Sequence, residues 1–203
     1  MLLKVMSSFS NPRVRRKNKP KQNFTNNNYR KAISALLKDF EGRCAYSLVH
    51  VKDCGERLME VDHHNPTFSG KIRNNYNNLF PATRHCNGKK SNTWPPKALR
   101  AKGIRFLNPC KEGDYGYQIF ENEGGELIGV TPAAKYHIVM LDLNDDHLVR
   151  RRRERTMLEK LIKETGIIMN AHASVDAISH HISEVKKMLS YSIPPIPSIP
   201  AEF

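Results

Sequence analysis

The stretch that decides the fold reads “EVDHHNP” over residues 60–66 and sets an aspartate, two histidines and an asparagine side by side. It overlaps “RLMEVDH” (57–63), which reads as a β-strand. Further along the chain, “NLFPAT” (78–83) reads as a second strand. The following “HCNGKKSN” (85–92) predicts a short helix, which the prolines of “TWPP” stop. The sequence therefore predicts two strands and a helix around an Asp-His pair.

Asp62 and His63 combine two functions that metal-assisted hydrolysis of a phosphodiester needs. A carboxylate is a hard oxygen ligand for Mg²⁺. A histidine that is not a ligand can take a proton from water near neutral pH. On an ideal strand the two side chains point to opposite faces. Both can serve one site if the strand ends or kinks there, which Asn65-Pro66 favours.

The second half of the site is expected from the segment around the second strand and the helix. Asn78 precedes that strand, and Asn87 lies at the start of the helix. A helix start offers free N–H groups to a phosphate, and Lys89 and Lys90 add positive charge at the same place. The segment therefore predicts a base, a metal site and an anion site close together.

Residues 44–94 resemble the HNH endonuclease family. Its pattern runs, loosely, Cys-x-x-Cys, Asp-His-x-x-Pro, Asn-Leu and Cys-x-x-Cys-[His or Asn]-x-x-Lys. The matching pieces appear here in that order as Cys44, “DHHNP” (62–66), “NL” (78–79) and “CNGKK” (86–90). The resemblance implies an α+β fold with a ββα-metal core, a hairpin and a helix that clasp one metal ion. We expect flanking helices and a small hairpin around this core.

The resemblance also implies roles for single residues. His63 would be the general base that activates water, and Asp62 and Asn87 would be the metal ligands. Asn78 would tie down the loop that carries His63. Because the ligands offer oxygen, we expect Mg²⁺ or Mn²⁺ as the cofactor rather than Zn²⁺.

Two further histidines compete with His63. His64 takes a position that is usually apolar in the family, so we expect a structural role or a phosphate contact. His85 could be a phosphate ligand or a third metal ligand. Lys89 and Lys90 are expected to contact the phosphate.

The cysteines depart from the family pattern, in which two Cys-x-x-Cys pairs often hold a structural zinc. Here Cys44 is followed by Ser47, and Thr83 precedes Cys86. Hydroxyl groups are poor zinc ligands. We therefore do not expect a structural zinc at Cys44 and Cys86, although Cys54 or His85 could substitute for a missing ligand. Without zinc, Cys44 and Cys86 should be small buried apolar residues.

“YHIVMLDLNDDHLVRRRRE” (136–154) resembles a Leu-Asn-x-x-x-Leu-x-x-x-Arg helix that follows the HNH core in a prokaryotic subgroup. That subgroup often accompanies an ATPase in anti-phage systems of the Septu type and in certain retrons. Arg152 fits its arginine, and we expect it to contact nucleic acid. Asn144 is expected to cap this helix and Gly166 to end it. Successive arginines face different sides of a helix, so others should form salt bridges within the protein.

The chain should divide into four parts. Residues 1–27 read as a flexible basic arm, residues 28–97 as a helix plus the HNH core, and residues 98–190 as an accessory region. The accessory region should contain a hairpin turning at Gly124-Gly125 and two helices, the last with one buried face. Residues 191–203 read as an extended proline-rich tail.

Composition favours a polyanionic partner. The 203 residues carry 33 Lys and Arg against 20 Asp and Glu, which gives a net charge of +13. The sequence shows no apolar run long enough to cross a membrane, and the apolar stretch at its start is too short for a secretory signal. We expect a cytoplasmic endonuclease that binds DNA and has an ATPase partner, as an effector of anti-phage defence. The alternatives are a non-cleaving nucleic-acid-binding module and a structural subunit of an ATPase complex, docked through the last helix and the tail.

Overall fold

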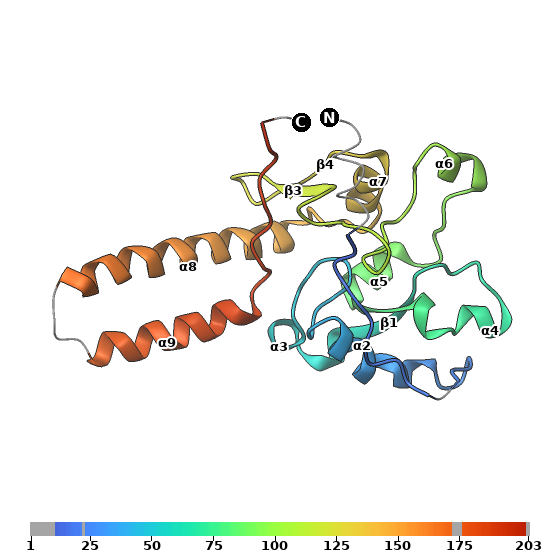
Figure 1. Ribbon diagram of the computed structural model, residues 1–203, viewed down its shortest axis with the longest axis horizontal. Coiled ribbons are helices and arrows are strands. Elements are labelled where there is room, and N and C mark those ends of the chain that lie inside the picture. The colour runs from blue at the N-terminus through green and yellow to red at the C-terminus, as the bar shows by residue number, and fades with distance from the viewer. Residues whose placement is uncertain (1–10, 22, 172–175, 202–203) are drawn as a thin grey trace.

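Residues 11–21, 23–171 and 176–201 are described by the computed structural model, without the side chains of residues 164–181. Within them, helices of varied length combine with two antiparallel sheets of two strands each. The fold is therefore α+β, as the sequence predicts. Figure 1 shows a body that holds both sheets and a long pair of helices that extends away from it.

The centre of the body is a pair of strands followed directly by a helix. Strand β1 (Met59–His63) pairs antiparallel with β2 (Leu79–Thr83), and His63 lies opposite Leu79. Helix α5 (Arg84–Lys90) begins immediately after β2. The two strands and the helix predicted from the sequence are confirmed, each within one or two residues of its expected start.

The two faces of β1 pack against different elements, as the alternation of side chains along a strand requires. Glu60 and Asp62 both contact side chains of α5. Val61, on the other face, belongs to a small core beneath η1 (Tyr29–Ala32) and α2 (Ile33–Asp39). The other buried members of this core are Phe24, Ala32, Leu36, Tyr76 and Leu79.

A larger core joins the central strands to the accessory region. It includes Phe80 of β2 and residues of β3 (Ile119–Glu121), β4 (Leu127–Gly129) and α7 (Pro132–Met140). The hairpin turns where the sequence predicts, because Gly125 adopts a φ of +78°, a conformation that glycine reaches without strain. Helix α7 was not predicted, although Pro132 at its first turn is a favourable start signal.

Short helical elements fill the connections that the sequence presents as turns. Each spans three to five residues, so its stability comes from its surroundings rather than from its own length. They are α3 (Val51–Cys54), η2 (Glu56–Leu58), α4 (Gly70–Arg73), η3 (Tyr76–Asn78) and α6 (Lys97–Ala101).

The start of helix α8 (Asp146–Ala171) differs from the expectation. Asn144 does not cap it, because its side-chain oxygen accepts from the N–H of Leu127 at 2.7 Å. Asp145 has that role instead and accepts from the N–H of His147 at 3.0 Å. The other end also differs, since the helix continues through Gly166.

Helix α9 (Asp176–Tyr191) runs back beside α8. Its expected buried face is present in part, because Ile182, Val185 and Leu189 are half-buried. Val175 and the side chain of Ile178, which complete the predicted face, lie outside the described residues. No helix in the described part of the chain is both long and apolar enough to cross a membrane.

The predicted flexible arm, residues 1–27, is packed onto the body over much of its described length. Arg13 forms an ion pair with the buried Asp114 at 2.9 Å. Arg16 donates to the carbonyl of Leu79 at 2.8 Å, at the start of β2. The prediction of a free arm is therefore wrong for these residues, while the first ten residues of the chain lie outside the described part.

The proline-rich tail also packs against the body. Ile193 and Ile196 are buried members of the larger core. The carbonyl of Pro197 accepts from the N–H of Glu121 at 3.0 Å, so the tail adds a backbone contact beside β3. These two isoleucines are not available as a docking element for a partner, which corrects that part of the expectation.

Candidate functional site

His63 ends β1 with its imidazole held between Tyr29 and Asn74. The Asn74 side-chain oxygen lies 2.9 Å from Nε2, and the Tyr29 ring centroid lies 4.6 Å from that of the imidazole. The Asn74 amide nitrogen donates to Asn26, which fixes which way the amide points. Because the Asn74 oxygen can only accept, Nε2 carries the hydrogen and Nδ1 keeps its lone pair.

The surroundings of His63 favour the neutral imidazole. Burial lowers the pKa of His63 below its usual value of 6.5, and the positive charge of Arg73 lowers it further. The hydrogen bond to Asn74 opposes this shift, but the net direction is downward. At neutral pH the side chain therefore has a lone pair ready to accept a proton, as a general base requires.

Asp62 lies on the opposite face of β1 in a buried ion pair. The Lys90 ammonium donates to Asp62 Oδ1 at 3.0 Å and to the carbonyl of His63 at 2.7 Å, while the Tyr46 hydroxyl donates to Asp62 Oδ2. The Lys90 side chain is 0% exposed and that of Asp62 is 3% exposed. The prediction that Lys90 contacts a phosphate is therefore wrong, because it has no surface to offer a ligand.

Asn87 pairs with a carboxylate that the sequence analysis did not single out. Its amide donates to Glu60 Oε2 at 2.7 Å, and Arg84 donates to Glu60 Oε1 at 3.0 Å. The hydrogen bond from Asn87 lowers the pKa of Glu60 most strongly, and the one from Arg84 lowers it further. A signal for Glu60 was present, because a residue two positions before Asp62 shares its face of the strand.

The residues around Asp62 have the right chemistry for Mg²⁺ or Mn²⁺ but not the right arrangement. Asp62, Glu60 and Asn87 all carry hard oxygen atoms. Both oxygens of Asp62, however, already accept hydrogen bonds from Lys90 and Tyr46. The Asn87 amide meanwhile donates to Glu60 rather than meeting Asp62. As placed, these side chains do not fit the ion, and metal binding at Asp62 requires at least one of these bonds to break.

Asn78 ties down the loop that follows His63, as expected. Its side-chain oxygen accepts from the N–H of Asn65 at 2.9 Å. Its amide donates to the carbonyls of Asn65 and Arg73 at 3.1 and 2.9 Å. One buried side chain thus joins both ends of the loop between Asn65 and Arg73, next to the point where Asn74 meets His63.

His64 is a structural residue in this fold. Its ring lies 4.7 Å from the Phe80 ring and 5.5 Å from that of Trp94, centroid to centroid. Burial lowers its pKa well below 6.5, and within the described chain its Nδ1 is buried without a hydrogen-bond partner. Of the two roles expected for His64, a structural role and a phosphate contact, these surroundings support the structural role.

The other predicted phosphate contacts on α5 face the start of α8. His85 Nε2 lies 3.2 Å from the carbonyl oxygen of Asp142. Lys89 forms an ion pair with the Asp142 carboxylate at 2.8 Å, and its side chain is 51% exposed. Lys89 therefore remains accessible to a phosphate, whereas Lys90 does not.

Arg152 is not accessible to nucleic acid in this fold, which corrects the expectation. Its side chain is among the largest that are fully buried. The guanidinium donates to the carbonyls of Gly125 and Leu143 and to the side chain of Asn144. It therefore joins α8 to the turn between β3 and β4, and the Leu-Asn-x-x-x-Leu-x-x-x-Arg pattern has a structural explanation here.

Cys44 and Cys86 are fully buried, as expected, and neither forms a disulfide. The Cys44 sulfur accepts from the backbone N–H groups of Tyr46 and Ser47 at 3.4 Å and of Thr83 at 3.3 Å. The Cys86 thiol also interacts with this sulfur, so the four positions of the two incomplete Cys pairs meet around Cys44. Two of the four are hydroxyl side chains, so the arrangement resembles a zinc site without its full set of thiolates.

A hollow of about 850 Å³ opens beside the loop that follows His63. Asn65 and Asn78 line one side of it. Its other lining residues include the aromatic Phe68, Trp94 and Phe106, the basic Arg100, Arg105 and Lys111, further asparagines, and Glu112, which forms an ion pair with Arg105. Aromatic faces can stack on bases, and cations attract phosphates, so the hollow suits a nucleotide strand.

No family model matches the chain, and neither a curated protein nor a solved structure matches it. The HNH assignment accordingly stays a prediction.

Proposed function

We propose that the chain is an endonuclease that hydrolyses phosphodiester bonds in DNA, with His63 as its general base. The observation that carries this proposal is the imidazole of His63 at the end of β1. It is held by Asn74, it is neutral near pH 7, and it lies within a strand–strand–helix unit whose order matches the HNH pattern. Few other residues can accept a proton from water at neutral pH.

The chemistry follows from the position of this base. His63 Nδ1 takes a proton from a water molecule, and the water oxygen attacks the phosphorus. The bond between the phosphorus and the 3′ oxygen breaks, and the 3′ oxygen takes a proton from solvent. The products are a 5′ phosphate and a 3′ hydroxyl. Asn74 and Asn78 hold the base and its loop during the reaction.

We include a requirement for Mg²⁺ or Mn²⁺ in the proposal. Asp62, Glu60 and Asn87 are hard oxygen donors on β1 and α5. These side chains would hold the ion only if Asp62 were freed from Lys90 or Tyr46, and the ion would supply a positive charge that stabilises the phosphate in the transition state. They lie on the face of β1 opposite the side chain of His63.

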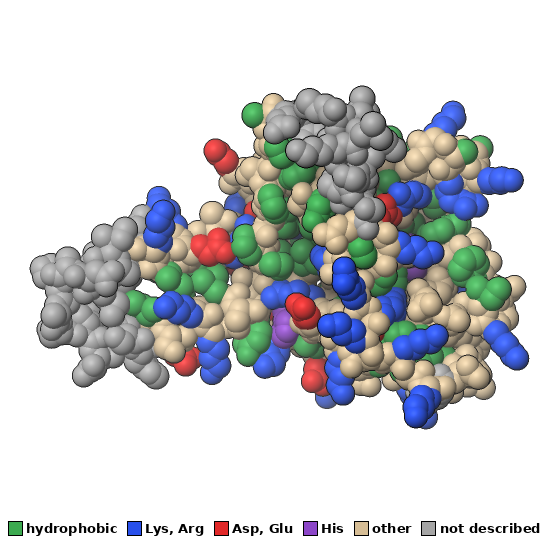
Figure 2. All heavy atoms as spheres, in the orientation of Figure 1, with side chains coloured by type: hydrophobic (Ala, Val, Ile, Leu, Met, Phe, Trp, Pro, Cys, Tyr) green, Lys and Arg blue, Asp and Glu red, His purple; other side chains and the backbone are tan. Residues whose placement is uncertain are grey.

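The surface supports a polyanionic substrate. Figure 2 shows lysine and arginine side chains spread over the visible face of the body, with fewer acidic ones. The net charge of +13 acts in the same direction. Binding through such charges is blind to sequence and weakens as salt is raised.

Nicking of supercoiled plasmid DNA tests the proposal. The wild type is incubated with Mg²⁺, Mn²⁺ or EDTA beside His63→Ala and a control, His50→Asn. The control removes a histidine that accepts from the N–H of Lys52 at the start of α3, and asparagine can accept in the same way. We expect metal-dependent nicking by the wild type and the control, and at least about a hundredfold loss in His63→Ala.

The alternatives give different results. Nicking that survives in His63→Ala would show that another residue is the base. Nicking that resists EDTA would contradict the metal requirement alone. Binding of DNA without cleavage under every condition would favour a non-cleaving nucleic-acid-binding module.

A further inference from the structure

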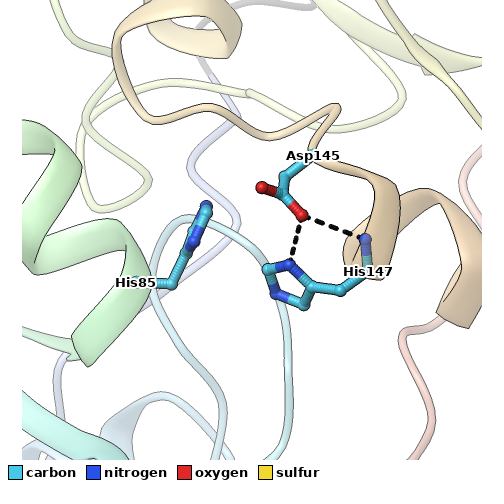
Figure 3. A group of neighbouring side chains, drawn as sticks. All are labelled: His85, Asp145 and His147. Carbon is cyan, nitrogen blue, oxygen red and sulfur yellow. Dashed lines mark hydrogen bonds and ion pairs between the residues drawn. The ribbon is translucent and has the colours of Figure 1, made fainter.

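A second group of side chains with metal-binding chemistry lies where α5 meets the start of α8. It consists of His85 in the first turn of α5, Asp145 just before α8, and His147 in the first turn of α8. Within the described chain these form the one group of three or more His, Cys, Asp or Glu residues whose donor atoms all lie within 4.8 Å of one another. Figure 3 shows the two imidazoles and the carboxylate facing a common space.

The contacts within this group are those of a site that can take a cation. Asp145 Oδ1 lies 2.5 Å from His147 Nδ1, and the two imidazole centroids are 4.7 Å apart with their rings nearly perpendicular. Asp145 accepts hydrogen bonds from the backbone N–H of His147 at 3.0 Å and from its ring nitrogen. Once the shared proton leaves His147 Nδ1, the group offers a nitrogen lone pair from each histidine and a carboxylate oxygen from Asp145.

Solvent can reach the group, so an ion has a route of entry. All three side chains are partly exposed. His85 and His147 also line a hollow of about 360 Å³, which has Val49, Leu58 and Leu148 among its apolar lining residues. The hollow is also lined by Asp53, Arg84 and Arg151, and both arginines are already paired with carboxylates, Arg151 with Asp53 and Arg84 with Glu60.

We propose that His85, Asp145 and His147 bind one divalent transition-metal ion, with Zn²⁺ as its first candidate. Imidazole nitrogen and carboxylate oxygen are ligands that zinc accepts, whereas Mg²⁺ prefers oxygen alone. The ion takes the place of the proton that Asp145 and His147 now share. Water completes the fourth position, since the described chain supplies three close ligands.

The bound ion would fasten two parts of the chain that are separated in sequence. His85 lies on the same short helix as Asn87, and Asp145 and His147 begin α8. The ion would thus hold α5 against the accessory region, in a chain whose Cys44 and Cys86 lack the partners for a zinc site of their own. This inference does not depend on nuclease activity.

Zinc binding by the metal-free full-length protein tests the proposal, measured by competition with a chromogenic chelator. We expect one site per chain in the wild type and an affinity at least about tenfold weaker in His85→Ala, His147→Ala and Asp145→Asn. Asp145→Asn keeps a side chain that can cap α8, so its loss of binding would not come from a frayed helix. Cys54→Ser, a variant of a thiol in the same hollow, should bind zinc as the wild type does.

A second measurement makes the result independent of the chelator. Zn²⁺ should raise the melting temperature of the wild type and of Cys54→Ser, but not that of His147→Ala. A millimolar excess of Mg²⁺ should not displace the zinc. The proposal is overturned if the wild type binds no zinc, or if the three variants bind it as tightly as the wild type.

Discussion

Two adjacent residues at the end of β1 meet different surroundings, although the sequence places them side by side. His63 faces Tyr29 and Asn74, while Asp62 faces α5. Strand geometry predicts the opposite directions of the two side chains. The expectation that a kink brings both to one site is not met, because β1 stays paired with β2 through His63. The burial of Lys90 against Asp62 could not be predicted, because the choice of partner for a buried charge depends on packing that the motif does not encode.

A test at the scale of the residue is the removal of the charge on Lys90. Lys90→Met keeps much of the length of the side chain but leaves Asp62 buried beside it without a cation. Breaking a buried pair in this way costs about 3–5 kcal/mol of stability. We therefore expect a large fall in the urea midpoint, measured by far-UV circular dichroism.

Lys89→Met is the matched control. Lys89 is the neighbouring residue on α5, but its ion pair with Asp142 lies at the surface. Exposed pairs of this kind contribute little to stability. Equal urea midpoints for Lys90→Met and Lys89→Met would show that the buried pair does not hold the site together.

At the scale of the element, the strands β1 and β2, helix α5 and the turn at Gly125 could be predicted from local signals. Strand formers, turn residues and glycine act over a few residues, and these signals agree here with the fold. The cap of α8 was predicted one residue early, because Asn144 is instead taken by the backbone of Leu127 in β4. That competing partner lies in another element, so inspection of the helix sequence alone does not reveal it.

The incomplete zinc site predicts the effect of completing it. In the double variant Ser47→Cys with Thr83→Cys, four thiols would surround the position where Cys44 and Cys86 already meet. Structural zinc sites use four such thiolates. We expect the double variant to bind one more zinc ion per chain than the wild type, measured by metal analysis after gel filtration.

The two single variants are the controls for this gain. Thr83→Cys alone also removes a hydroxyl that accepts from the N–H of Cys86 at the start of α5, a loss of about 1 kcal/mol. Each single variant has three thiols and should hold zinc more weakly than the double variant. A double variant with no added zinc would mean that the four side chains do not converge on one point.

At the scale of the whole molecule, both described ends of the chain are built into the body. The sequence could not show this, because the basic and proline-rich segments have the composition of solvated tails. Arg16 donates to backbone carbonyls, among them that of Leu79. Because every residue has a backbone carbonyl, the sequence does not indicate which ones Arg16 will contact. Ile193 and Ile196 find their apolar partners only once the accessory region has folded.

Buried histidines predict that the protein is less stable in acid. Burial lowers the pKa of His137 to about 3 and that of His64 well below 6.5. Above pH 6.5 these side chains are neutral in both states. Below it, the unfolded chain takes up protons that the folded chain cannot, so stability is lost as pH falls. For His137 this amounts to about 2 kcal/mol between pH 6.5 and pH 5, and His64 acts in the same direction.

The urea midpoint at about pH 7.5 and about pH 5 checks this expectation, and a lower midpoint in acid is the predicted result. His137→Gln is the control, since glutamine can still accept from the N–H of Leu107 but does not titrate. Its loss of stability in acid should be smaller than that of the wild type. An unchanged midpoint at the lower pH would contradict the prediction.

The contact between Pro197 and Glu121 has a consequence for synthesis on the ribosome. Strand β3 gains this backbone partner, and the larger core gains Ile193 and Ile196, only after the chain has been translated past residue 197. Arg13 likewise waits for Asp114, about a hundred residues downstream. The body therefore cannot finish folding domain by domain as the nascent chain emerges, and the proposed nuclease activity would be completed only late in translation.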